Sequence, residues 1–138
     1  MALILDTGAL LGALDRTDPA HDRCRALIEG ERGALVIPSP VLVELDYWLR
    51  DPLYGGEFLT VLRNVVEGAY TIVDLVLSDY ERVRELCARY ADADVGFVDA
   101  AVLAIVERLE EPKLAKLDRR HFALMRPRHV EALALLPV

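Results

Sequence analysis

The sequence predicts an α/β fold in which a short central parallel β-sheet is flanked by helices on both faces. The chain has 138 residues and is 54% hydrophobic, which is enough for one ordinary domain with a substantial core. Apolar runs of about four residues alternate with roughly 10 to 30 residues of helical period, so little chain is left for hairpins. Such spacing favours parallel β-α units.

The first half of the chain has clear strand runs and one clear helix start. Residues 2–5 and 34–37 are apolar runs that predict strands. Ser39 followed by Pro40 is a typical helix start, with Ser39 as the cap, and Pro52 lies just beyond the end of that helix. The helices predicted in this half are 7–15, 19–29 and 40–50.

The second half continues the same alternation. Its predicted elements are a helix at 57–67, a strand at 71–73, helices at 78–90 and 97–110, and strands at 114–117 and 133–136. Pro112 closes the last of these helices. The chain has no internal repeat and no linker-like stretch, so residues 1–138 are predicted to form one domain.

Charge and cysteine content limit the function classes. The chain has 16 Lys and Arg against 23 Asp and Glu, a net charge of -7, which argues against a protein that holds nucleic acid through many phosphate contacts. An enzyme that binds nucleic acid through a metal ion remains compatible with this charge. Cys24 and Cys87 lie in apolar helical patterns and are expected to be reduced core thiols. No apolar run is long enough for a signal peptide or a membrane span, so a soluble cytoplasmic protein is expected.

Two acids directly follow predicted strands. Asp6 ends the run 2–5 and Asp118 ends the run 114–117. In an open parallel sheet, ligands and chemistry lie at the carboxyl ends of the strands, so these two acids can share one crevice. The alternative is that each caps the segment that follows it.

Two further acids interrupt apolar faces of predicted helices. Glu44 has apolar residues three and four positions away on both sides, and Asp99 lies in the run FVDAAV at 97–102. A buried carboxylate without a partner is costly, which favours a functional role for both. The alternatives are a Glu44 that extends to solvent at the helix edge and an Asp99 that interacts with the helix dipole.

The four acids together predict a metal site. No Lys, Arg or His occupies a similarly apolar position, so converging carboxylates would repel one another unless their pKa values rise or a cation binds. On that reasoning, Asp6→Asn or Asp99→Asn would stabilise the metal-free protein. Carboxylate oxygens select hard cations, so Mg²⁺ or Mn²⁺ is expected, with a metal-activated water for phosphodiester hydrolysis.

The sequence resembles PIN-domain ribonucleases over essentially its whole length, in particular VapC-type toxins of toxin–antitoxin pairs. The matching segments are LDTGAL at 5–10, PVLVEL at 40–45, YAD at 90–92 with GFVDA at 96–100, and LDRRHF at 117–122. The resemblance implies an acidic site formed by Asp6, Glu44, Asp99 and Asp118. It implies that Asp6 and Asp99 are the primary metal ligands, that Asp118 and Glu44 complete the shell, and that the Thr7 hydroxyl supports Asp6.

The resemblance also implies an endoribonuclease acting on RNA, a cognate VapB-like antitoxin and a homodimer. The helices at 7–15, 19–29 and 40–50 are rich enough in apolar residues to supply an interface.

Several other residues have weaker claims to a role in the site. Asp92 and Asp94 precede the Asp99 helix, where either can be its N-cap, and Asp92 can also support the site. His21 and His121 lie in Arg-rich segments that are expected to be surface, so a general-base role is disfavoured. Arg119 and Arg120 can contact RNA phosphate but are expected to be a solvated pair. Tyr47 and Trp48 are expected to be core or dimer contacts rather than platforms for base stacking.

Two other functions remain open at this point. A haloacid-dehalogenase-like phosphatase is disfavoured because Gly8 occupies the place of the second Asp that such enzymes need. A catalytically inert PIN-fold interaction module is disfavoured because all four acids are present. Metal-dependent RNA cleavage separates the inert module from the nuclease.

Overall fold

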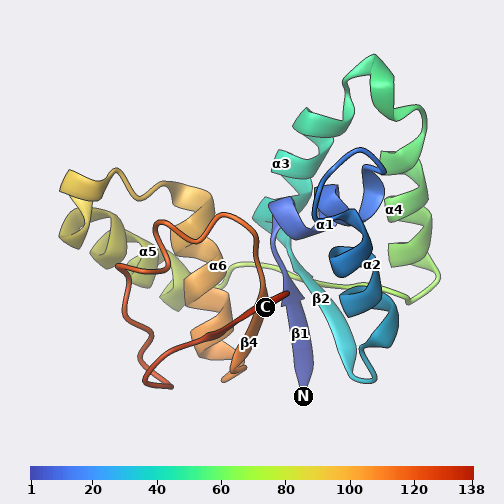
Figure 1. The fold of residues 1–138 in the computed structure, drawn as a ribbon. Coiled ribbons are helices and arrows are strands. Elements are labelled where there is room, and N and C mark those ends of the chain that lie inside the picture. Colours follow the sequence, from blue (N-terminus) through green and yellow to red (C-terminus); the bar gives the residue numbers. More distant parts are fainter.

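The computed structural model describes all residues, 1–138, and contains a five-stranded parallel β-sheet with helices on both faces (Figure 1). The strand order is β3-β2-β1-β4-β5, and each neighbouring pair is parallel. The strands are β1 Ala2–Leu5, β2 Ala34–Pro38, β3 Thr71–Val73, β4 Lys113–Ala115 and β5 Ala134–Leu136. The predicted fold class is confirmed.

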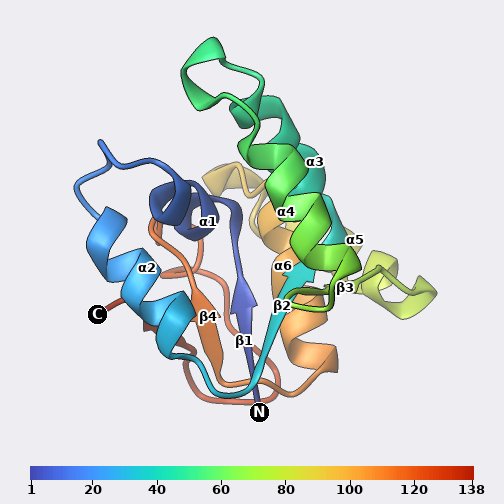
Figure 2. The ribbon, with the colours of Figure 1, turned by 90° about the vertical axis from the view of Figure 1, so that its right-hand side faces the viewer.

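Helices cover both faces of this sheet. They are α1 Thr7–Leu14, α2 His21–Gly30, α3 Ser39–Leu49, α4 Glu57–Val66, α5 Leu77–Arg89 and α6 Phe97–Arg108, with short 3-10 helices at Pro52–Tyr54 and Ala91–Ala93. Figure 2 shows α1 and α2 in front of the sheet and α6 behind it. None of the helices has the length and apolar character needed to cross a membrane.

Strand β1 lies at the centre of the sheet, and α6 is the most deeply buried helix. Every residue of β1 is buried, and so is every residue from 100 to 106 of α6. A strand with neighbours on both edges and helices on both faces must be apolar throughout. Asp6 and Asp99 therefore border the two most apolar segments of the chain, which is why they stand out in the sequence.

Several predicted boundaries differ from the structure by one or two residues, and one of these differences affects the site. Helix α2 begins at His21 rather than at residue 19, and α3 begins at Ser39, so Pro38 and not Ser39 is in the cap position. Strand β4 ends at Ala115 rather than at residue 117. The backbone carbonyl of Lys116 accepts a hydrogen bond from Arg119 Nε instead of continuing the ladder, so the chain turns before Asp118.

Both cysteines are unpaired thiols, Cys24 buried and Cys87 half-buried. Cys24 packs against Gly12 where α1 meets α2, and a Cβ at Gly12 would lie 3.1 Å from the Cys24 sulfur. Burial raises the pKa of the Cys24 thiol, which makes this cysteine a packing residue rather than a reactive one.

Candidate active site

Asp6 lies at the carboxyl end of the central strand and is 5% exposed. It occupies the cap position of α1, but its side chain makes no capping hydrogen bond. Its Oδ2 atom instead accepts a hydrogen bond from Lys116 Nζ at 2.7 Å. The capping alternative is therefore not realised by the Asp6 side chain, whose partner is the residue that directly follows the neighbouring strand β4.

Lys116 is placed beside Asp6 by strand pairing. Leu5 and Ala115 are partners in the β1–β4 ladder, so the next residues, Asp6 and Lys116, are also adjacent. Lys116 is 3% exposed, and its Nζ atom also donates to Asp99 Oδ1 at 3.0 Å. The expectation that no basic side chain lies among the acids is wrong, because this ammonium bridges two of them.

Asp99 is held from both sides in the first turn of α6. Its Oδ1 atom accepts from Lys116, and its Oδ2 atom lies 2.6 Å from His121 Nδ1. A carboxylate only accepts hydrogen bonds, so His121 Nδ1 carries the hydrogen in this contact. His121, which was expected to be a surface residue, is half-buried and belongs to the site.

Burial and charge act in opposite directions on the central pair. Burial raises the pKa of the Asp6 carboxyl above its ordinary value, although the Lys116 ammonium lowers it. Burial alone would lower the pKa of Lys116, but Asp6 and Asp99 together raise it above its ordinary value. Burial, and only to a smaller extent the charge of Asp99, raises the pKa of Asp6, so crowding of acids is not the main cause. The cation that compensates the two acids in this structure is an ammonium group.

Asp118 lies at the rim rather than inside this network. Its side chain is 59% exposed and pairs with Arg120 at 2.7 Å. Hydrogen bonds from Arg120 lower the pKa of Asp118 to about 2, and Lys116 acts more weakly in the same direction. Asp118 also accepts from the backbone N–H of Arg120, so the predicted local capping role is partly realised.

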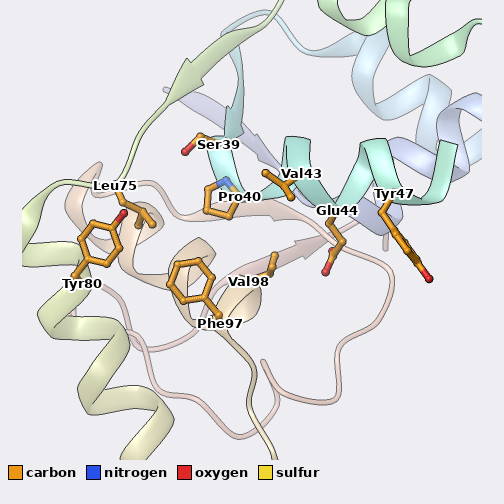
Figure 3. A pocket seen from close by; sticks show the side chains of 9 residues that line it. All are labelled: Ser39, Pro40, Val43, Glu44, Tyr47, Leu75, Tyr80, Phe97 and Val98. Carbon is orange, nitrogen blue, oxygen red and sulfur yellow. The ribbon is translucent and has the colours of Figure 1, made fainter. Parts of the chain in front are cut away.

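Glu44 projects from α3 into an apolar pocket of about 600 Å³. Figure 3 shows Glu44 between Val43 and Tyr47, across from Phe97 and Val98 at the start of α6. Val98 immediately precedes Asp99, so Glu44 faces the same turn of α6 that carries Asp99. Glu44 is half-buried and makes no ion pair within the chain.

The structure thus unites Asp6 and Asp99 and leaves Asp118 and Glu44 at the rim. No three His, Cys, Asp or Glu side chains converge closely enough to form a metal-binding group by themselves. The Oδ1 atom of Asp6 is nevertheless buried without any hydrogen-bond partner. An unsatisfied buried carboxylate oxygen is costly, and oxygen donors suit Mg²⁺ or Mn²⁺, so the residues fit one divalent cation at this atom.

The remaining candidates have structural roles or are exposed. His21 Nδ1 lies 2.8 Å from the Gly12 carbonyl, which joins α2 to α1. Asp92 and Asp94 are exposed, and neither caps α6, whose cap is Gly96. The Thr7 hydroxyl is buried without a partner, so the expected bond to Asp6 is not formed.

The arginines and aromatic residues also differ from expectation in part. Arg119 binds two backbone carbonyls, those of Lys116 and Pro137, and is therefore not a free phosphate contact. Arg120 is exposed, as expected, but paired with Asp118. Tyr47 and Trp48 are exposed and form an edge-to-face pair with centroids 5.5 Å apart, so neither belongs to the core.

Sequence reasoning missed Lys116 and undervalued His121. The signal for Lys116 was present, because it is a charged residue in the apolar run LAKL that follows the last long helix. The same argument that selected Asp6 and Asp99 applies to it. His121 carried no such signal, since its contact with Asp99 depends on how the chain turns after β4.

Comparison with known proteins identifies the family of this chain. A scan against models of known protein families found no match. The chain is 32% identical over 125 residues to Ribonuclease VapC26 of Mycobacterium tuberculosis, an alignment that covers 91% of this chain and 93% of that protein.

Among solved structures, the chain superposes on VapC20 of Mycobacterium tuberculosis, which is described as a sarcin-ricin loop cleaving toxin. The TM-score is 0.80 and the sequence identity 16%, and the alignment covers 94% of this chain and 98% of that one. A second solved structure is VapBC2 from Rickettsia felis, bound to a DNA fragment from its promoter. It superposes with a TM-score of 0.69 and 17% sequence identity, and the alignment covers 99% of this chain and 98% of that one.

A parallel sheet covered on both faces, with Asp6 at the end of its central strand, is the architecture of a PIN domain. The chain belongs to the VapC family of PIN-domain ribonuclease toxins. This membership favours the nuclease over the phosphatase and over the catalytically inert interaction module.

Proposed function

We propose that this chain is a Mg²⁺-dependent endoribonuclease, with Mn²⁺ as an alternative ion, and the toxin of a VapBC-type toxin–antitoxin pair. The observation that carries the proposal is the buried Asp6 carboxylate, which has one unpartnered oxygen at the end of the central strand. Lys116 bridges Asp6 to Asp99. We propose further that residues 1–138 are one PIN domain, which one contiguous core cluster supports.

In this proposal Asp6 and Asp99 hold the ion, and Asp118 and Glu44 complete its shell, directly or through water. When bound, Mg²⁺ supplies a water of lowered pKa and neutralises charge that develops on the phosphate. His121 fixes the orientation of Asp99 through its 2.6 Å contact, as a residue behind a metal ligand commonly does. Burial of Asp6 at a strand end keeps its carboxylate in one position.

Cleavage and stability should both depend on the metal. Labelled RNA should be cut in Mg²⁺ or Mn²⁺ and remain intact in EDTA. The thermal midpoint should rise when Mg²⁺ or Mn²⁺ replaces EDTA, because an ion that binds only the folded state stabilises it by about 2.7 kcal/mol at one hundred times its Kd. Undiminished cleavage in EDTA together with an unchanged midpoint would contradict the proposal.

The proposed partners are a VapB-like antitoxin, an RNA substrate and a second copy of the chain, with the cytoplasm as the site of action. VapBC complexes among the structural neighbours support the antitoxin. Of the three helices expected to supply an apolar surface, α1 and α2 expose no large apolar side chain, whereas α3 exposes Val43, Tyr47 and Trp48. Helix α4, which was not expected to contribute, also exposes large apolar side chains.

We assign the second copy to the α3 surface. The pocket there is concave, and the exposed aromatic residues Tyr47, Trp48 and Phe97 beside it can fill the equivalent pocket of a second chain. A two-fold interface needs this kind of self-complementarity. The exposed row Leu59, Leu62 and Val66 on α4 borders no pocket of comparable apolar character.

Val43→Asp should therefore convert a dimer to a monomer, because Val43 lines the pocket and is 75% exposed. Light scattering coupled to size exclusion measures the mass directly. Val66→Asp is the matched control, since Val66 is 86% exposed on α4, and it should leave the mass unchanged. A dimer that survives Val43→Asp and dissociates with Val66→Asp would move the interface to α4.

A further inference from the structure

Lys116 is held between the two central acids by its backbone as well as by its side chain. Its N–H donates to the Leu136 carbonyl of β5 at 2.8 Å, and its register places it next to Asp6 at the end of β1. The side chain is 4% exposed, with Nζ 5.1 Å from the centre of the Phe122 ring. The ammonium is therefore a fixed part of the site and not a surface charge near it.

The hydrogen bonds of the two acids leave very little room for cations. Asp6 Oδ2 and Asp99 Oδ1 accept from Lys116, and Asp99 Oδ2 contacts His121. Asp6 Oδ1 is the one remaining carboxylate oxygen of this pair, and it has no partner. One positive charge already lies between the acids, and the three oxygens that have hydrogen-bond partners keep only their remaining lone pairs for a metal ion.

We propose that Lys116 is a resident counter-cation that takes one of the cation positions between Asp6 and Asp99. The inference rests on the proposed metal-dependent function and refines it: the site accepts a single divalent ion, bound more weakly than it would be without Lys116. Two effects act together. The ammonium repels a nearby divalent ion, and it occupies carboxylate oxygens that the ion would otherwise use.

A direct contact between Lys116 and the RNA phosphate is the competing role for a lysine in a nuclease. The burial of Lys116 argues against it, because an ammonium that is bonded to two carboxylates and enclosed by Phe122 is out of reach of a polyanion. Lys116 is accordingly a positioning residue that acts through the two acids.

Mn²⁺ titration by calorimetry tests the inference on the full chain. Lys116→Met removes the charge and keeps the length of the side chain, and Lys116→Gln also keeps a hydrogen-bond donor. Both should bind Mn²⁺ at least about tenfold more tightly than wild type. The stoichiometry should rise from one ion to two. Lys113→Met is the matched control. Lys113 is the other lysine of the chain, lies at the opposite end of β4 and pairs with Glu31. The Lys113→Met variant should bind Mn²⁺ with the affinity and stoichiometry of wild type.

Thermal midpoints provide a second measurement if the metal-free variants are unstable. The Lys116 variants should melt below wild type in EDTA and gain more than wild type when Mn²⁺ is added. Variants that fold only with Mn²⁺ would support the inference, and variants that fail to fold even with Mn²⁺ would overturn it.

The two proposals can fail separately. Unchanged or weaker Mn²⁺ affinity in both Lys116 variants, with binding by wild type intact, overturns the role of Lys116 and leaves the metal-dependent nuclease standing. Absence of Mn²⁺ binding in wild type and in every variant overturns the metal site and the role of Lys116 with it.

Discussion

Asp6→Asn and Asp99→Asn should each reduce RNA cleavage at least about 100-fold, since even residues behind metal ligands commonly contribute 10- to 100-fold. Asn keeps the shape of the side chain but removes the charge that the proposed ion needs. Both variants should also lose Mn²⁺ binding. Initial rates on labelled RNA, measured at saturating Mg²⁺ and well below the thermal midpoint of each variant, give the comparison.

Asp92→Asn is the matched control for these variants. It makes the same change at an exposed aspartate in the short 3-10 helix Ala91–Ala93 that precedes α6. Asp92 forms no hydrogen bond with the Asp6–Lys116–Asp99 group. Its cleavage rate should equal that of wild type. If Asp6→Asn retained more than about a tenth of the wild-type rate, Asp6 would not be a ligand of the catalytic ion.

The sign of the stability effect in these variants depends on Lys116. Crowded acids alone would make the metal-free Asn variants more stable than wild type, because repulsion is relieved. With Lys116 2.7 Å from Asp6 and 3.0 Å from Asp99, the same substitutions instead leave a buried ammonium with one carboxylate partner. We therefore expect lower thermal midpoints in EDTA for both variants.

Asp79→Ala should destabilise the fold by about 2 to 4 kcal/mol, the largest effect expected outside the site. Asp79 is 3% exposed, accepts from the Val76 N–H at 3.0 Å at the start of α5, and pairs with Arg108 Nε of α6 at 3.0 Å. The change removes a helix cap and a buried partner for a charged group in one step. Because the Arg108 side chain is 31% exposed, its guanidinium regains some water, which keeps the loss within this range.

Urea unfolding at neutral pH measures this loss, and Glu81→Ala on the same helix is the control. Glu81 pairs with Arg84 one turn away, and both side chains are more than half exposed. Its removal should leave the unfolding midpoint unchanged, because exposed ion pairs contribute little. Equal midpoints for Asp79→Ala and wild type would show that the α5–α6 contact does not depend on this ion pair.

The sequence by itself determined the layered α/β fold and two of the site residues. Short apolar runs separated by helical stretches can be satisfied only by parallel strands with helices on both sides, so local pattern is sufficient there. Asp6 and Asp99 stood out because each borders an apolar segment that becomes fully buried, residues 2–5 and 100–106.

Only the tertiary structure decided which groups those acids meet. The pairing of Leu5 with Ala115 brings together Asp6 and Lys116, which are 110 positions apart in sequence, and the early end of β4 turns Asp118 toward Arg120 and His121 toward Asp99. Strand register and chain turns fix these contacts. Because β1 is buried on both faces, its sequence has no alternation of apolar and polar residues that could specify the register. A carboxylate in an apolar run thus identifies a buried charge, but its partner depends on which strands lie side by side.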